Sequence, residues 1–218
     1  MEVSLETIVL WAVPVIFAIT LHEAAHGYVA KLFGDRTAEM LGRISLNPLK
    51  HIDPIGTLLV PGVLLTLAWI NKSPPFVFGW AKPVPVNFGN LRDPRRDMIW
   101  VAAAGPGSNF LQALIWALAL VATAPAGVAP SAALFEMADI GFKVNLILMA
   151  LNLLPLPPLD GGRVLAGLLP PSAASALARV EPFGLFIILA LLATGLLDDM
   201  MRPLVRAATG VIARIVGL

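Results

Sequence analysis

Residues 5–33 read LETIVLWAVPVIFAITLHEAAHGYVAKLF, an apolar stretch long enough to cross a bilayer as one helix. Three ionisable groups, His22, Glu23 and His26, fall within this stretch toward its C-terminal end. Such groups are costly inside a membrane helix and usually serve a function. The stretch therefore predicts a membrane protein and marks the place of a functional site.

Composition agrees with a membrane environment for much of the chain. Of its 218 residues, 58% are hydrophobic and 13% are charged, whereas a soluble domain is about half apolar and about a quarter charged. The N-terminus has no basic region before its apolar run, which favours a retained helix over a cleaved signal peptide. Further apolar stretches lie at residues 55–70, 97–124, 132–154 and 182–197.

The same composition excludes several functions. A net charge of +1 favours neither nucleic acid nor an acidic partner. The chain has no cysteine, which removes disulfides, thiolate catalysis and cysteine-ligated zinc. The length permits one compact helical domain over residues 1–218 and leaves no room for an additional soluble domain.

The distribution of basic residues predicts the topology. Lys and Arg gather in residues 34–54 and 71–96, and none occurs in the connection 124–131. Because basic residues favour the cytoplasmic side, we expect both basic segments there. Residues 55–70 would then enter the membrane and return, turning at Pro61-Gly62; a full crossing is the alternative. We predict an all-α polytopic bundle of about five transmembrane helices, with this re-entrant loop and short extended segments at the cytoplasmic side.

The spacing of His22 and His26 predicts a metal site. Four residues are just over one helical turn, so both side chains project from one face and can share a tetrahedral zinc. Glu23 lies about 100° around the helix from His22, within reach of water at the metal. This is the H-E-x-x-H arrangement, in which the glutamate is the general base. The alternative is two histidines satisfied by neighbouring helices, with Glu23 paired to a basic residue.

A catalytic zinc normally has three protein ligands and one open position, so a further ligand is needed. Residues 152–162 read NLLPLPPLDGG, where prolines stop a regular helix and glycines allow a tight turn. The predicted topology brings Asp160 to the depth of His26, which makes it the candidate. The alternative for Asp160 is a cap of the following helix.

Polar residues in apolar surroundings complete the candidates. Asn109 ends the sequence GPGSN at residues 105–109, where the small residues allow another backbone to come close. Asn109 could point toward the metal or hydrogen-bond a substrate carbonyl. We expect both Asn109 and Asn152 either to bind substrate or to support a metal ligand from behind, with packing as the alternative for each. Packing alone would also explain the glycines. We expect His51, the remaining histidine, to lie at the membrane interface.

Together these motifs resemble the site-2 protease family of intramembrane metalloproteases. The likeness is greatest to its compact bacterial members without PDZ or CBS domains, which carry sequences similar to residues 47–54 and 80–86. The resemblance covers residues 8–170 and leaves C-terminal helices at 172–218. It rests on three ordered motifs: His22-Glu23-x-x-His26, Gly105-Pro106-Gly107-Ser108-Asn109 and Leu159-Asp160-Gly161.

The resemblance implies one Zn2+ held at the positions of His22, His26 and Asp160, and proteolysis within the membrane. We expect Glu23 to move the proton during metal-assisted amide hydrolysis. A transmembrane substrate has to unwind, and the extended segments 40–54 and 80–88 are candidate edges for it to pair with.

The expected setting is a bacterial inner membrane, crossed several times, with the site toward the cytoplasm. Lipid and a transmembrane protein substrate are then the partners, and nucleic acid is not. Two other classes compete with a protease, namely a membrane metal or proton transporter and a catalytically inactive scaffold of the same fold.

Overall fold

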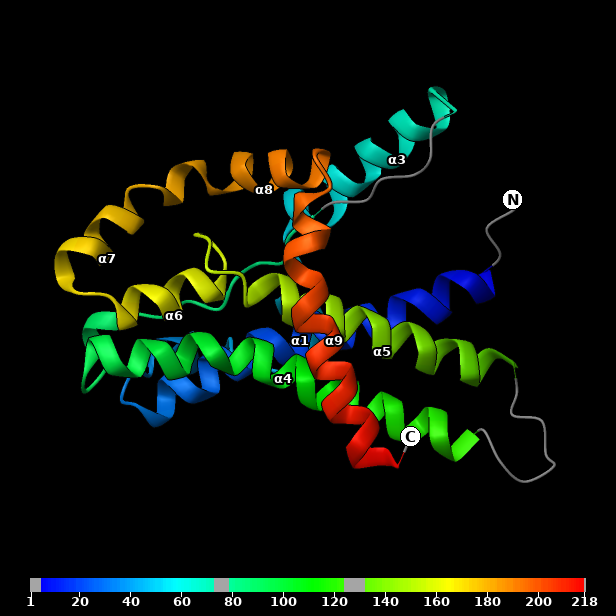
Figure 1. The fold of residues 1–218 in the computed structure, drawn as a ribbon, viewed down its shortest axis with the longest axis horizontal. Helices are drawn as coiled ribbons and strands as arrows, with labels where there is room; N and C mark the ends of the chain where they lie inside the picture. The colour runs from blue at the N-terminus through cyan, green and yellow to red at the C-terminus, as the bar shows by residue number, and fades with distance from the viewer. Residues whose placement is uncertain (1–4, 73–78, 124–131, 218) are drawn as a thin grey trace.

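The computed structural model describes residues 5–72, 79–123 and 132–217, and these form helices and irregular segments with no strand among them (Figure 1). The long helices are α1 (Leu5–Leu32), α4 (Pro94–Thr123), α5 (Ala132–Asn152) and α9 (Leu196–Val216). The shorter ones are α2 (Thr37–Met40), α3 (Val60–Ile70), α6 (Asp160–Leu168), α7 (Pro171–Ala178) and α8 (Gly184–Ala193). Single turns lie at η1 (Pro48–Lys50), η3 (Phe88–Asn90) and η4 (Glu181–Phe183), and a π-helix, η2, at Pro54–Leu59. The predicted all-α class is confirmed.

Within the described residues, three helical stretches are long and apolar enough to cross a membrane. They are Glu6–Leu32, Pro94–Ala122 and Pro171–Ala193, the last built from α7, η4 and α8. Helix α5 has 21 residues but is more polar, because it carries Glu136, Asp139 and Lys143. The chain is a membrane protein, as predicted, and a count of about five crossings stays a prediction. The connection 124–131, used in the charge argument, lies outside the described residues.

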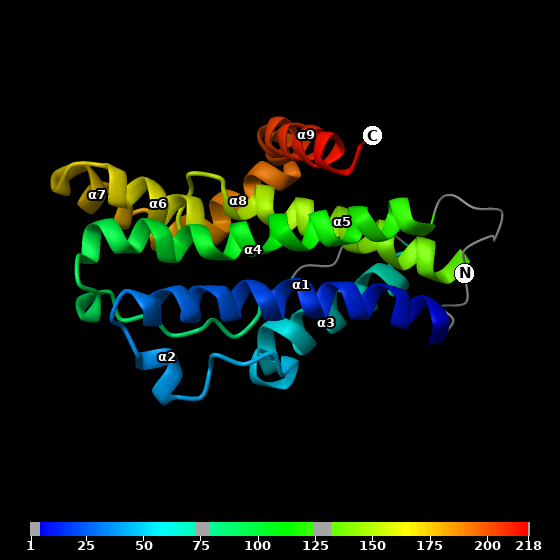
Figure 2. The ribbon, with the colours of Figure 1, turned by 90° about the horizontal axis from the view of Figure 1, so that it is seen from below.

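Three helices form the body of the molecule. Helices α1, α4 and α5 run alongside one another (Figures 1 and 2). Helix α6 packs against the first part of α4, where Arg95 Nε donates a hydrogen bond of 3.0 Å to the Gly167 carbonyl. Helix α9 crosses α4 and α5 at a steep angle and buries Ala208 and Ile212 against them (Figure 1).

The predicted turning point at Pro61-Gly62 is wrong. Both residues lie inside α3, which continues from η2 without a turn. Pro61 is the second residue of α3 and directly follows the π-helical residues of η2. The Pro-Gly pair therefore does not reverse the chain.

The ends of this segment nevertheless meet. The Trp80 N–H donates to the Gly56 carbonyl at 3.1 Å, and the Lys82 N–H donates to the His51 carbonyl at 2.9 Å. The chain thus runs away along η2 and α3, and at Trp80 it again lies beside Gly56, near the start of η2. This agrees with a segment that starts and ends on one side; its insertion into a bilayer stays a prediction.

Two further expectations concern the polar loops. His51 is buried, and its Nε2 lies 2.9 Å from the Ser45 carbonyl oxygen; its expected position at the membrane interface stays a prediction. Its ring contacts its own loop, whereas its backbone carbonyl accepts a hydrogen bond from the Lys82 N–H and so joins this loop to the segment after α3. The proposed edge segments 40–54 and 80–88 form no ladder with each other or with the rest of the described chain.

Candidate metal centre

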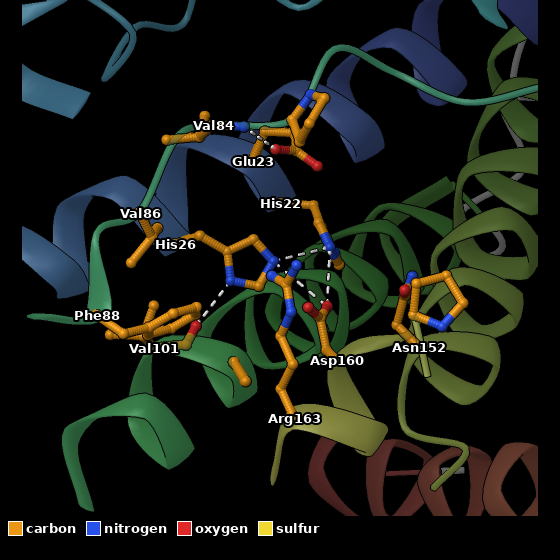
Figure 3. Close-up of a pocket in the computed structure, with 13 residues that line it drawn as sticks. His22, Glu23, His26, Val84, Val86, Phe88, Val101, Asn152, Asp160 and Arg163 are labelled. Atoms are coloured by element: carbon orange, nitrogen blue, oxygen red, sulfur yellow. Dashed lines mark hydrogen bonds and ion pairs between the residues drawn. The ribbon is translucent and has the colours of Figure 1, made fainter. Parts of the chain in front are cut away.

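Helices α1 and α6 bring His22, His26 and Asp160 together (Figure 3). One turn of α1 separates the two histidines, so their rings meet edge to face with centroids 4.7 Å apart. Their Nε2 atoms lie 3.1 Å apart, and Asp160 Oδ2 lies 3.2 Å from that of His22 and 3.3 Å from that of His26. The three predicted ligand residues therefore converge on one point.

Asp160 is held there by the turn before α6. It is the first residue of that helix, its predecessor Leu159 takes the N-cap position, and no side chain caps the helix. A Cβ at Gly161 would overlap the backbone of Leu153 and Leu154. The glycine therefore lets α6 begin close against the end of α5. The alternative of Asp160 as a helix cap is wrong, because its carboxylate faces the histidines instead.

The distances between the three atoms fit a zinc ion. Zinc bonds of about 2.0–2.2 Å in a tetrahedron separate the ligand atoms by about 3.3–3.6 Å, and the observed 3.1–3.3 Å are close to this. Asp160 Oδ2 is buried and accepts no hydrogen bond. Three protein ligands leave the fourth position open, as in catalytic zinc sites.

Hydrogen bonds behind the histidines fix their tautomers. His26 Nδ1 lies 2.7 Å from the Val101 carbonyl oxygen, and His22 Nδ1 lies 2.7 Å from Asn109 Oδ1. Both partners are acceptors, so each Nδ1 carries a proton, and Nε2 is the atom that each ring directs toward Asp160 as a metal ligand. Two lone pairs and a carboxylate oxygen repel one another unless a cation lies between them. The chemistry of the donor set therefore fits Zn2+.

Asn109 is itself held by neighbours on two helices. Its Nδ2 donates to the Ala18 carbonyl at 3.2 Å and to Asn145 Oδ1 at 2.9 Å, which leaves Oδ1 for His22. Asn109 and Asn145 are fully buried. Asn109 thus lies behind the metal position and supports a ligand, one of the two roles expected of it.

Gly105 explains the small residues of the predicted motif. A Cβ at this position would overlap the rings of both His22 and His26, whereas a Cβ at Gly107 would meet no described atom within 4 Å. Helix α4 continues through Pro106 without a break. The motif therefore brings the backbone of α4 directly against the two rings, and only the first of its glycines is needed for that contact.

A cavity of about 160 Å³ opens in front of the three ligand atoms. Glu23, Asn152 and Arg163 line it, together with Val84 and Phe88 from the extended segment (Figure 3). Glu23 Oε2 accepts a hydrogen bond of 2.7 Å from the Val84 N–H. Asn152 Nδ2 donates to the Leu148 carbonyl at 3.0 Å.

Sequence reasoning missed three contributors to this site. Asn145 lies seven residues before Asn152 in an apolar helix, so shared helical facing could have revealed it. Arg163 lies one turn after Asp160 and could have been found in the same way. The Val101 carbonyl is a backbone group that no sequence pattern marks.

Comparison with known proteins agrees with this geometry. The chain is 39% identical over 199 residues to "Putative zinc metalloprotease YwhC" of Bacillus subtilis, which covers 89% of this chain and 85% of that protein. It is 32% identical over 192 residues to "Putative zinc metalloprotease Rip2" of Mycolicibacterium smegmatis, covering 87% of this chain and 69% of the relative. No family model and no solved structure matches the chain. With such identity over most of its length and a site fitted to zinc, the chain belongs to the site-2 protease family of zinc metalloproteases.

Proposed function

We propose that this protein hydrolyses peptide bonds within or near the transmembrane segments of other membrane proteins, on the cytoplasmic side of a bacterial cell membrane. One observation carries the proposal. Three zinc-type ligand atoms converge beside a glutamate, and two of them belong to α1, a helix long and apolar enough to span a bilayer. A peptide bond attacked there has to lie at or near membrane depth.

The protein's own groups divide the chemistry. His22, His26 and Asp160 hold zinc, which supplies Lewis acidity toward a carbonyl group and acidifies water. Glu23 accepts a proton from the attacking water and later delivers it to the nitrogen of the leaving amine. Its carboxylate lies in the cavity wall beside Val84. Transfer through Glu23 therefore requires its hydrogen bond to Val84 to leave one oxygen available, which the single bond to Oε2 permits.

The two asparagines take different roles. Asn109 is buried behind His22 and serves as its hydrogen-bond acceptor, so it fixes the ligand rather than the substrate. Asn152 lines the cavity, with its Nδ2 bonded to a backbone carbonyl of its own helix. We assign Asn152 to substrate binding, because its side chain borders the space in which an unwound peptide would lie.

The direct test is Glu23→Gln, which keeps the shape of the side chain but cannot accept a proton. The purified variant should retain one zinc and lose about 10²–10⁴-fold of its cleavage rate on a reporter transmembrane substrate. Glu136→Gln makes the same chemical change at an exposed position of α5 and should cleave normally. Metal analysis and single-turnover cleavage measure the two properties separately.

The outcomes separate the competing classes. Cleavage by wild type that disappears in Glu23→Gln with zinc retained supports the protease. Zinc binding without any cleavage by wild type points to an inactive scaffold. Zinc moved across a sealed vesicle, with no cleavage, indicates a transporter, and near-normal cleavage by Glu23→Gln removes that residue from the mechanism.

A further inference from the structure

Arg163 is the basic residue of the metal cavity. It lies on α6, one turn after Asp160, and its side chain runs from that helix toward the region of His26 and Asp160 (Figure 3). Among the described residues that line the cavity it is the sole Lys or Arg. Its Cζ lies 5.8 Å from the centre of the Phe88 ring, over the face of that ring. The guanidinium therefore lies against the cavity wall, over the Phe88 ring.

The charge of Arg163 has no counterion among the residues that the structure describes. No ion pair joins it to a described carboxylate, and Asp160, on the same helix, contacts the two histidines instead. Two other arginines donate to backbone carbonyls: Arg95 to those of Gly167 and Leu169, and Arg43 to that of Lys82. Arg163 keeps its hydrogen-bond donors available at the site.

A free cation beside a zinc site needs a reason, since the two positive charges repel. The reaction supplies one. When the oxygen of water bonds to the scissile carbon, the π electrons of the C=O bond move onto the carbonyl oxygen, which becomes negative. The proton released by water goes to Glu23. Reformation of C=O then expels the nitrogen, which takes that proton, so the products are a carboxyl group and an amine. Between these steps the negative charge that the Glu23 carboxylate carries at rest lies on the carbonyl oxygen instead.

We propose that Arg163 donates hydrogen bonds to the scissile carbonyl oxygen as this negative charge develops. The inference rests on the proposed protease function. Glu23 reaches the cavity from α1 and Arg163 from α6 (Figure 3). Proton transfer and charge stabilisation thus come from two different walls. The planar guanidinium suits an oxygen anion because its donors form a fixed fork, and the Phe88 face restricts where that fork can go.

The test compares Arg163→Ala with Arg206→Ala, the same change at an exposed position of α9 outside the cavity. Loss of one stabilising donor typically lowers kcat about 10²–10³-fold. We expect this loss in Arg163→Ala with little change in KM and with one zinc retained. Arg163→Lys should recover only part of the rate, because lysine keeps the charge without the fork.

Two measurements distinguish a role of Arg163 in the reaction from a purely structural role. Guanidinium ion added at concentrations below those that unfold the protein should restore part of the kcat of Arg163→Ala. Urea, a neutral molecule of similar shape, should not. A phosphinic peptide built on the mapped cleavage sequence carries a tetrahedral anion in place of the scissile carbonyl. Its Kd should rise in Arg163→Ala about as much as kcat falls.

Failure of the proposed protease function and failure of the proposed role of Arg163 give different results. If wild type cleaves nothing, the proposed function is wrong, whatever Arg163 does. If wild type cleaves and Arg163→Ala, with zinc bound, cleaves within about threefold of it, the role of Arg163 is overturned. Equal rescue by urea and guanidinium, or a lost rate with unchanged binding of the phosphinic peptide, overturns it as well, because either result assigns Arg163 a purely structural role.

Discussion

Helices α4 and α5 present two contrasting faces to their neighbours. Toward α1 they offer a buried polar network, in which Asn145 holds Asn109 and Asn109 holds His22. Toward α9 they offer apolar packing alone. The buried members of that cluster are Ala113, Ala117, Leu146, Met149, Ala150, Ala208 and Ile212.

The two faces differ because apolar and polar contacts between helices contribute differently to partner choice in a membrane. Lipid is as apolar as leucine, so apolar contact between helices gives little preference for one partner over another. A buried amide or imidazole, in contrast, needs a specific partner and loses free energy without it. The polar face therefore determines how α1 meets α4 and α5, and with it the position of the metal ligands, while the apolar face only fills space.

Gly105→Ala tests the polar face most severely. The added Cβ overlaps both histidine rings, so at least one ring has to leave the metal position. We expect zinc affinity to fall by more than the roughly 10–100-fold typical of changes behind the ligands. Gly107→Ala is the matched control, because its Cβ meets open space. Titration of zinc against a chromogenic chelator measures both; equal affinities would show that α4 can move away from the rings.

The contrast between the faces predicts opposite outcomes for Asn145→Leu and Ile212→Ala. Asn145→Leu removes the partner that orients Asn109, so zinc affinity should fall about 10–100-fold. Ile212→Ala removes packing and should cost about 2 kcal/mol of unfolding free energy while leaving zinc affinity unchanged. Zinc titration and unfolding in detergent measure the two quantities. Loss of zinc affinity in Ile212→Ala would break the division between the faces.

The smallest effect is expected at Asp35, outside the membrane-spanning stretches. Burial raises the pKa of this carboxyl, but hydrogen bonds from Thr37, Asn87 and Asn90 more than offset this and hold it below its ordinary 3.8. The stabilisation is therefore complete above the unfolded pKa and is lost as pH falls through the lower folded value. The backbone N–H of Asn87 donates to Asp35 Oδ2 at 2.7 Å, so its protection against hydrogen exchange should fall in acid.

Asp35→Asn sharpens this prediction. The variant keeps a hydrogen-bond acceptor without the charge, so protection at neutral pH should fall several-fold and its acid dependence should vanish. Because Val84, Val86 and Phe88 border the cavity, a change in cleavage rate without a change in zinc affinity would show that the hydrogen bonds of Asp35 act on the substrate side. An acid dependence that persists in Asp35→Asn would assign the effect to another group.

The sequence by itself determined the elements and most of the chemistry. Apolar length marked α1, α4 and α5, because a membrane leaves few alternatives to a helix of that length. The four-residue spacing within α1 predicted that His22 and His26 share a face, since local helical geometry alone decides it. The charges of the flanking loops predicted that both lie on one side of the membrane; the hydrogen bonds that join residues 51 and 56 to residues 82 and 80 agree with this, and the membrane topology stays a prediction.

Only the tertiary structure decided how distant groups meet. That Asp160 faces the histidines rather than capping its helix depends on the packing of Gly161 against the end of α5. The approach of Arg163 to the cavity likewise depends on α1 and on residues 83–88, which lie far from it along the chain. Local spacing fixes the direction of a side chain along its own helix, whereas its partner is chosen by the packing of helices, which no short stretch of sequence specifies.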